Sequence, residues 1–255
     1  MDTRLIIDGD IFLYQQAFAA ETEICWDEEN ELWTLYGELP QARAGFEESI
    51  SKVQEVTGIK DYIVCFTGKK VFRLDLLPEY KVNRSGKRKP VLINPLRDYI
   101  RDKHPSMTVP HLEADDLLGC LAGPRDIMVS SDKDLQTVPG MHFNPNDPLR
   151  GVEQIVPLEA AYNHFIQTLT GDSVDNFKGC PGVGAVTARK LVPAGPPREM
   201  WNSVVEAFAK KGLDESHALT QARMAYILRG NDYNFTTNEI THWTPENYSE
   251  QDRSV

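Results

Sequence analysis

The chain has 255 residues, 41% of them hydrophobic, and a formal net charge of −11. This length and composition fit one large or two small globular domains with a buried core. The absence of any run of about 18 apolar residues excludes a membrane-spanning helix, and the net acidity argues against a general nucleic-acid coat protein.

The first residues, MDTRLIIDGD, lack the long apolar stretch of a signal peptide. We therefore expect a cytoplasmic protein, in the host-cell cytoplasm if it is phage-encoded. Four scattered cysteines without a C-x-x-C pair are typical of reduced packing residues. The six histidines include no H-x-x-x-H pair, so a zinc site has little support.

Apolar runs and helical patterns alternate through the first part of the chain. Strands are predicted at residues 4–8, 62–66, 106–110 and 126–131, and helices at 43–57, 91–103 and 114–121. This alternation predicts an α/β fold with a parallel sheet. From about residue 157 onward the sequence predicts helices punctuated by glycines, and no convincing strand.

A basic segment interrupts this acidic chain. Residues 69–103 contain eleven Lys or Arg and four acids, a local charge of +7, which leaves −18 for the rest. Such a segment is either a solvated basic loop or a binding site for a polyanion beside an acidic site.

Acids follow directly after three of the predicted strands. Asp8, Glu113 and Asp132 occupy these positions, and ligands of open parallel sheets bind at the carboxyl ends of the strands. Asp115 lies about 200° around a helix from Glu113, so both can face one site only if Glu113 precedes the helix. With their neighbours these acids form a predicted cluster of about eight carboxylates, completed by Asp115, Asp116, Asp134, Asp172 and Asp175.

Each acidic motif taken alone is also explained as a helix cap or turn. Together, however, so many like charges need compensation. Oxygen ligands without His or Cys favour Mg²⁺ or Mn²⁺, and more than four acids suggest two ions, an arrangement suited to in-line attack on a phosphodiester.

A glycine-rich turn at 179–184 enters a helix that carries Arg189 and Lys190. Its backbone N–H groups, at Gly182 and Gly184 among others, suit a phosphate. The G-x-G-x-x-A pattern also occurs in nucleotide-binding folds, but no strand precedes it here. A helix-turn-helix that contacts the DNA backbone therefore fits better than a nucleotide-binding loop. An ordinary turn between two helices is the remaining alternative.

Six motifs in this order resemble the flap endonuclease / 5'-to-3' exonuclease family: IIDGD, FRLDLLPEYKVNR, LEADDLLG, SSDKDL, GDSVDN and GCPGVGAVTARKL. The tail QARMAYILRGNDYNFTTNEITHW looks most like the gene-6-type exonucleases of T-odd, short-tailed phages.

The resemblance implies a PIN-like nuclease domain at 1–156 with a helical arch at about 74–103. It also implies a helical DNA-binding region at 157–255 with a helix-three-turn-helix at about 171–192.

For the site, the resemblance implies two metal positions. The first matches Asp8, Glu113, Asp115 and Asp132, with Asp116 beside it, and the second matches Asp134, Asp172 and Asp175, with Asp115 able to serve both. Lys81 and Arg84 match residues that engage the scissile phosphate, so the expected catalytic residues are Lys81, Arg84, Asp8, Glu113, Asp115 and Asp132. The expected DNA-binding residues are Arg73, Tyr80 as a base-stacking ring, Lys87, Arg88, Lys89, Gly182, Gly184, Arg189 and Lys190.

The expected function is structure-dependent hydrolysis of DNA at 5' ends, flaps or nicks, and of RNA in RNA–DNA hybrids, during phage-type replication or recombination. The expected cofactors are two Mg²⁺ or Mn²⁺ ions, with K⁺ at the helix-three-turn-helix, and the expected state is a monomer. One departure stands out: Thr67 or Gly68 occupies the place where much of the family has an aspartate, and Asp10 or water is expected to compensate.

Two rival functions fit less well. A haloacid-dehalogenase-like phosphatase would use the Asp-x-Asp at 8–10, but Phe12 and the shortened G-D-x-x-D depart from that pattern. A protein that binds branched DNA without cutting it would gain from replacing these acids with basic or neutral residues.

Overall fold

The computed structural model describes residues 3–248. A six-stranded sheet lies at its centre in the order β5-β4-β1-β6-β7-β8. Its strands are β1 (Leu5–Asp8), β4 (Tyr62–Phe66), β5 (Ser106–Thr108), β6 (Ile127–Val129), β7 (Gly140–Phe143) and β8 (Val152–Ile155). All neighbours are parallel except β7 and β8. The predicted α/β class is thereby confirmed, and β7 and β8 are additional to the predicted strands.

Side-chain alternation along β1 gives each face of the sheet its own core. Leu5 and Ile7 belong to one buried cluster, together with residues of α1 (Gly9–Ala19), α2 (Leu39–Thr57) and α4 (Ile93–Lys103). Ile6 belongs to the other cluster, together with α5 (Ala114–Leu121) and the C-terminal helices. The sheet is therefore covered by helices on both faces, as its apolar strands require.

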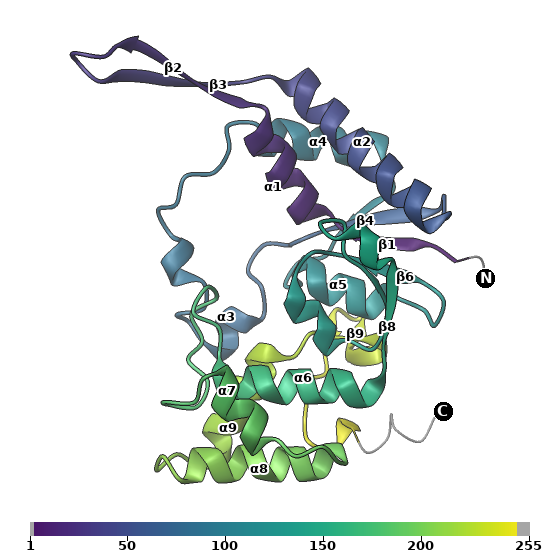
Figure 1. The fold of residues 1–255 in the computed structure, drawn as a ribbon, viewed down its shortest axis with the longest axis vertical. Coiled ribbons are helices and arrows are strands. Elements are labelled where there is room, and N and C mark those ends of the chain that lie inside the picture. The colour runs from purple at the N-terminus through teal and green to yellow at the C-terminus, as the bar shows by residue number, and fades with distance from the viewer. Residues whose placement is uncertain (1–2, 249–255) are drawn as a thin grey trace.

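The C-terminal part consists of α6 (Pro157–Thr170), α7 (Ala185–Leu191), α8 (Pro197–Ala209) and α9 (Glu215–Ala225), as predicted. These helices pack below the sheet in Figure 1. The expectation of no strand in this region is wrong in one detail. Beyond η4 (Gly230–Asp232), the short strands β9 (Tyr233–Asn234) and β10 (Glu239–Ile240) pair antiparallel.

A two-stranded hairpin, β2 (Glu21–Asp27) with β3 (Leu32–Gly37), projects from the body between α1 and α2 (Figure 1). It was absent from the predicted elements, although β3 (LWTLYG) is mostly apolar. Its side chains are exposed or half-buried and belong to neither of the two large buried clusters.

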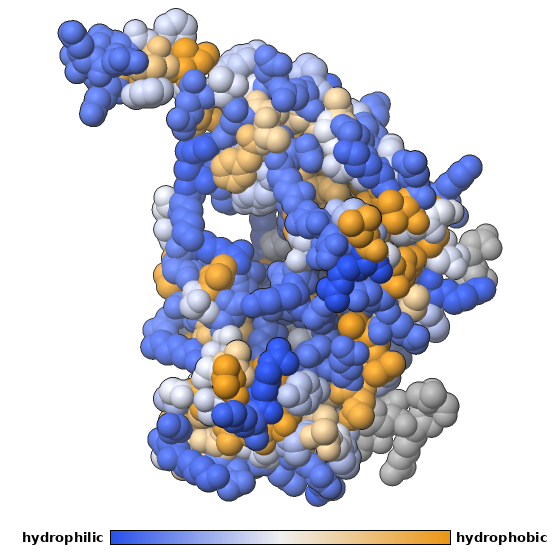
Figure 2. Space-filling model, viewed as in Figure 1, coloured by the Kyte–Doolittle hydropathy of each residue, from blue (hydrophilic) through white to orange (hydrophobic). Residues whose placement is uncertain are grey.

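The expected arch is helical only near its ends. Beyond α3 (Arg73–Leu76) the chain forms one 3₁₀ turn, η1 (Val82–Arg84), and residues 85–92 then run without regular structure to α4. Gly86, at φ +85°, and the prolines at 78 and 90 interrupt helical hydrogen bonding here. We call residues 77–92 the strap. Figure 2 shows an opening through the molecule beside the strap's extended part.

None of the helices within residues 3–248 has the length and apolar character needed to cross a bilayer.

Candidate functional site

Three neighbouring strands, β4, β1 and β6, end at one edge of the sheet with polar residues. Asp8 closes β1 and is 4% exposed, and its Oδ2 accepts a hydrogen bond of 3.0 Å from Ser130 Oγ, just beyond β6. Ser130 Oγ in turn accepts from the backbone N–H of Asp132 at 3.1 Å. One serine thus links two of the predicted acids. Sequence reasoning did not single it out, although it lies two residues before Asp132.

Glu113 and Asp115 join this edge from the start of α5. Glu113 precedes the helix with extended backbone angles (φ −85°, ψ 164°), which confirms that it lies outside the helix proper. Asp115 lies in the first turn, and its buried Oδ1 has no hydrogen-bond partner among residues 3–248. Burial, followed by the charges of Asp8 and Asp132, holds the pKa of Asp115 well above its usual value.

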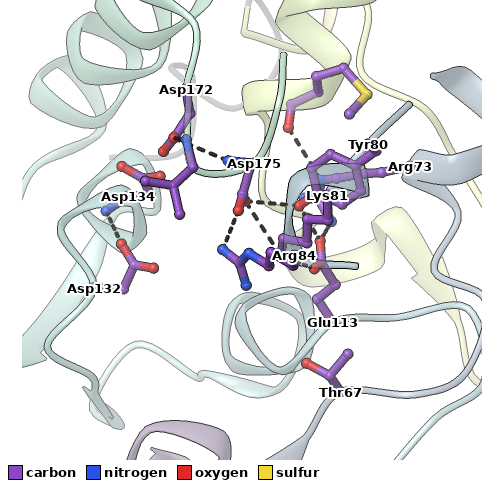
Figure 3. A network of polar contacts seen from close by, with 12 residues as sticks. Thr67, Arg73, Tyr80, Lys81, Arg84, Glu113, Asp132, Asp134, Asp172 and Asp175 are labelled. Atoms are coloured by element: carbon purple, nitrogen blue, oxygen red, sulfur yellow. Dashed lines mark hydrogen bonds and ion pairs between the residues drawn. The ribbon is translucent and has the colours of Figure 1, made fainter. Parts of the chain in front are cut away.

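Asp134, Asp172 and Asp175 form a second acidic group. Burial, with the neighbouring charges of Asp132 and Asp172, raises the pKa of Asp134 to about 7. Asp172 Oδ1 accepts from the backbone N–H groups of Val174 at 2.6 Å and Asp175 at 3.2 Å, which fixes the turn. Figure 3 shows these three acids beside Glu113 and its partners Tyr80 and Lys81.

The strap brings cations to the carboxylates. Lys81 Nζ forms ion pairs with Glu113 and, at 3.4 Å, with Asp175, and Arg84 also pairs with Asp175 (Figure 3). Burial alone would raise the pKa of Glu113, but Arg73 and Lys81 bring it below its usual value. The backbone of the strap is fixed as well, because Lys81 N–H donates to the Asp175 carbonyl at 2.9 Å.

The two expected metal sites are not preformed in this structure. Among residues 3–248, no three acidic, histidine or cysteine side chains are grouped as one metal site. Glu113 and Asp175 instead form ion pairs with Lys81 and Arg84 of the strap.

The donor chemistry still suits hard divalent ions. All the donors are oxygens, Asp115 offers a buried unpaired oxygen, and burial with nearby acids raises the pKa of Asp8 to about 7. An additional positive charge among these acids would therefore be favourable.

Three expected site residues are buried beside Glu113, with their polar groups engaged inside the protein. Arg73 is 3% exposed and all its hydrogen bonds are internal, so it presents no group to DNA. The Tyr80 ring is 5% exposed and its hydroxyl contacts Glu113 and Asp175, so it has no face free for a base. Asp116 is fully buried, and four N–H donors occupy its carboxylate, so it cannot be a direct metal ligand as placed.

Comparison with known proteins places this site in a family. Residues 3–145 match the family described as 5'-3' exonuclease, N-terminal resolvase-like domain. The chain belongs to this 5'-3' exonuclease family. It is 29% identical to the exonuclease of Escherichia phage T7 over 285 residues, covering 94% of this chain and 93% of that protein.

Solved structures with the same fold come from phage T5. Its 5'-exonuclease with bound zinc ions matches with a TM-score of 0.56 at 17% identity, covering 88% of this chain and 89% of that one. A T5 flap endonuclease in a pseudo-enzyme–product complex with DNA and metal ions matches with a TM-score of 0.53 at 16% identity, covering 88% and 93%.

The structure also shows what occupies the place after β4 where an aspartate was expected from the resemblance. Gly68 cannot carry a side chain, because a Cβ there would lie 2.1 Å from the Val109 carbonyl oxygen. Thr67 therefore holds the place next to β4, and its Oγ1 accepts from the N–H of Ala114 at 3.1 Å. Asp10 accepts from Thr67 N–H at 2.9 Å and pairs with Arg97 at 3.5 Å, so it is already engaged.

The remaining expected DNA contacts are exposed on two surfaces. Lys87, Arg88 and Lys89 lie on the strap, where Arg88 pairs with Glu21 of β2 at 2.8 Å. Gly182, Gly184, Arg189 and Lys190 lie on the turn before α7 and on α7 itself. Gly182 adopts φ +74°, a conformation that favours glycine.

Proposed function

We propose that this chain is a structure-dependent 5'-to-3' exonuclease and flap endonuclease that hydrolyses DNA with two Mg²⁺ or Mn²⁺ ions. The observation that carries the proposal is the buried, unpaired Asp115 oxygen among acids at the sheet edge, next to Glu113, which pairs with Lys81 of the strap. The T5 complex with DNA and metal ions supports it through a shared fold.

The acids divide into two ligand groups under this proposal. Asp8, Glu113, Asp115 and Asp132 would hold one ion, and Asp134, Asp172 and Asp175 the other. When bound, the ions supply positive charge that activates water and stabilises the leaving oxygen.

The protein's own part is orientation and charge. Ser130 fixes Asp8 and Asp132 relative to one another through its two hydrogen bonds. Lys81 and Arg84 offer their charges to the scissile phosphate, since they lie on the strap at the edge of the acids. Arg84 is about half exposed, which leaves its guanidinium accessible to a phosphate.

Duplex DNA would lie on the turn before α7. Gly182 and Gly184 are exposed on this turn, and with Arg189 and Lys190 they suit phosphate oxygens. The carbonyls of such a turn suit a K⁺ ion. The single-stranded 5' end would pass through the opening beside the strap, past Lys87 and Lys89 (Figure 2). In this arrangement residues 1–156 supply most of the acids that cleave the strand, and residues 157–255 bind the duplex.

The same proposal covers the biological setting. Similarity to the T7 exonuclease supports a role in phage-type replication or recombination, in the host-cell cytoplasm, with RNA in RNA–DNA hybrids as a further substrate. The protein acts as a monomer in this proposal, because both acidic groups and the strap belong to one chain.

Cleavage of a labelled 5'-flap DNA in Mg²⁺ tests the assignment. Asp132→Ala should reduce the rate at least about 100-fold, because a carboxylate near both acidic groups is lost. Asp147→Ala, which removes an exposed acid paired with Arg150, is the control and should leave the rate unchanged. Chelation by EDTA should abolish cleavage, and Mg²⁺ or Mn²⁺ should restore it. Undiminished cleavage by Asp132→Ala would refute the assignment.

Lys81→Ala tests the role of the strap cation. It should depress kcat at least about tenfold while changing duplex affinity less than about threefold, because Lys81 faces the acids rather than the turn before α7. Lys52→Ala removes an exposed lysine paired with Glu48 and serves as the control. An equal loss of kcat and affinity would argue against a catalytic role for Lys81.

A further inference from the structure

Arg73 is a fully buried arginine with every donor in use. Its Nε–H donates to the Met224 carbonyl at 3.2 Å. One terminal nitrogen donates to Glu113 Oε2 and to Asp116 Oδ2, both at 2.7 Å. The other donates to Asp116 Oδ1 at 2.9 Å and to the Tyr226 carbonyl at 2.7 Å. These five bonds equal the five N–H groups of a guanidinium.

The partners of Arg73 come from segments distant in the sequence. Asp116 accepts two further bonds of 3.1 Å each, from the backbone N–H groups of Glu113 and Leu228. Arg73 and Asp116 together thus tie the start of α5 to the chain after α9. A guanidinium suits this task because its planar fork binds a carboxylate at two points and two carbonyls besides.

The two carboxylate oxygens of Glu113 have different hydrogen-bond partners. Arg73 and the Tyr80 hydroxyl both donate to Oε2, at 2.7 and 2.9 Å, while Lys81 alone contacts Oε1. Two buried donors therefore fix the carboxylate through Oε2. Oε1 contacts the partly exposed Lys81, which a cation bound at this oxygen would displace.

We propose that Arg73 is a positioning residue that fixes Oε2 of Glu113 and thereby presents Oε1 to a divalent cation. The proposal rests on the proposed function, in which Glu113 is a metal ligand. Outer-shell partners of this kind orient metal ligands. The expected DNA contact of Arg73 is replaced by a role inside the protein.

Mn²⁺ binding to the full chain, measured by calorimetry without DNA, tests the proposal. Arg73→Lys keeps the charge but has fewer donors and no fork, so Mn²⁺ affinity should fall about 10- to 100-fold. The matched control is Arg229→Lys. Arg229 is 7% exposed and donates to the Tyr226 hydroxyl and the Thr137 carbonyl, and none of these bonds involves Glu113. The control should retain wild-type affinity even if it loses stability.

Tyr80→Phe provides a milder variant if Arg73→Lys does not fold. It removes the second donor to Oε2 and keeps the ring, and affinity should fall about three- to tenfold. Affinities within twofold of wild type in the folded Arg73→Lys or Tyr80→Phe variants would overturn the positioning role. A wild-type protein that binds no Mn²⁺ would instead refute the proposed function.

Cleavage kinetics separate positioning from general damage. With Arg73→Lys, the Mn²⁺ concentration for half-maximal rate should rise in step with the Kd, and saturating Mn²⁺ should restore most of kcat. A fall in kcat that Mn²⁺ does not restore, at unchanged Mn²⁺ affinity, would contradict the proposal.

Discussion

At the residue scale, His164 is an ionisable ring enclosed by aromatic neighbours. It is fully buried, its Nε2 bonds the Ala222 carbonyl at 2.8 Å, and its Nδ1 contacts the Tyr248 hydroxyl at 3.0 Å. Phe165 and Trp243 lie against it. Burial lowers the pKa of His164 to about 3, so the ring stays neutral in the folded protein and carries one proton, on Nε2.

This shift predicts a pH-dependent stability. The unfolded chain takes up the proton near the ordinary histidine pKa of about 6.5, whereas the folded chain does so only near 3. The contribution of His164 is thus complete above about pH 6.5 and decreases by about 1.4 kcal/mol per pH unit as the pH falls toward 3. In urea unfolding between about pH 6 and pH 4, His164→Gln should show a flatter loss of stability than wild type.

His217→Gln is the control for this measurement, because His217 is an exposed side chain on α9. It should follow the wild-type slope. Equal slopes for wild type and His164→Gln would show that protonation of His164 is not what destabilises the protein in acid.

The grouping of the acids at the strand ends was predictable from the sequence. The burial of Arg73 and Tyr80 was not. The carboxyl ends of parallel strands share one edge, so the position of Asp8 relative to Asp132 followed from the order of elements. The burial of Arg73 and Tyr80 depends on partners such as Glu113, Asp175 and Tyr226. No local pattern in the sequence contains that information.

At the element scale, α5 packs closely on the chain that follows α9. A Cβ on Gly119 would lie 2.2 Å from the Leu228 carbonyl oxygen, a separation that only movement of a backbone segment can relieve. The same contact region holds the Asp116 bond to Leu228 N–H. The glycine within this helix is therefore a packing requirement rather than a flexible point.

Gly119→Ala should destabilise the protein by about 1–3 kcal/mol, through overpacking of a tight contact. Thermal and urea unfolding measure the change. Gly184→Ala is the matched control, because its Cβ would meet nothing within 4 Å and its φ is −92°. It should alter stability by less than about 0.5 kcal/mol. If the two variants are equally stable, the close approach at Gly119 does not constrain the fold.

Helix positions followed well from periodicity, while exposed or interrupted elements did not. The predicted 114–121 is α5 to the residue, and the predicted 43–57 is all but the first turn of α2. The β2–β3 hairpin was not predicted, although β3 is mostly apolar, because its apolar side chains lie at the surface and do not show the alternation of a half-buried strand. The strap departed from the helical expectation where Gly86 and two prolines interrupt it.

At the scale of the whole molecule, one core spans the predicted division at residue 156. Ile6, Leu117 and Leu118 from the sheet part share a buried cluster with Phe165 and Tyr226 from the helical part. In addition, α3 contacts α9, and α6 contacts η2 (Lys133–Thr137). The two parts differ in composition, as the sequence indicated, yet they bury one another's apolar surface.

Residues 1–156 alone should consequently fail to fold cooperatively. Without α6 to α9, one face of the sheet and of α5 would expose the apolar side chains of this cluster to water. We expect a broad, non-cooperative urea transition and strong binding of a hydrophobic dye, compared with a single sharp transition for the full chain. A sharp transition for residues 1–156 would show that the nuclease part is an independent domain.

The opening beside the strap has a topological consequence (Figure 2). Continuous polypeptide borders it, and the strap is tied down at both ends, by the Lys81 and Arg84 pairs and by the Arg88 pair with Glu21. A single strand of DNA can be threaded through such a ring only from a free end. A covalently closed single-stranded circle should therefore remain intact when the linear form of the same sequence is degraded. Whatever its affinity for the protein surface, the circle has no path to the acids through the ring.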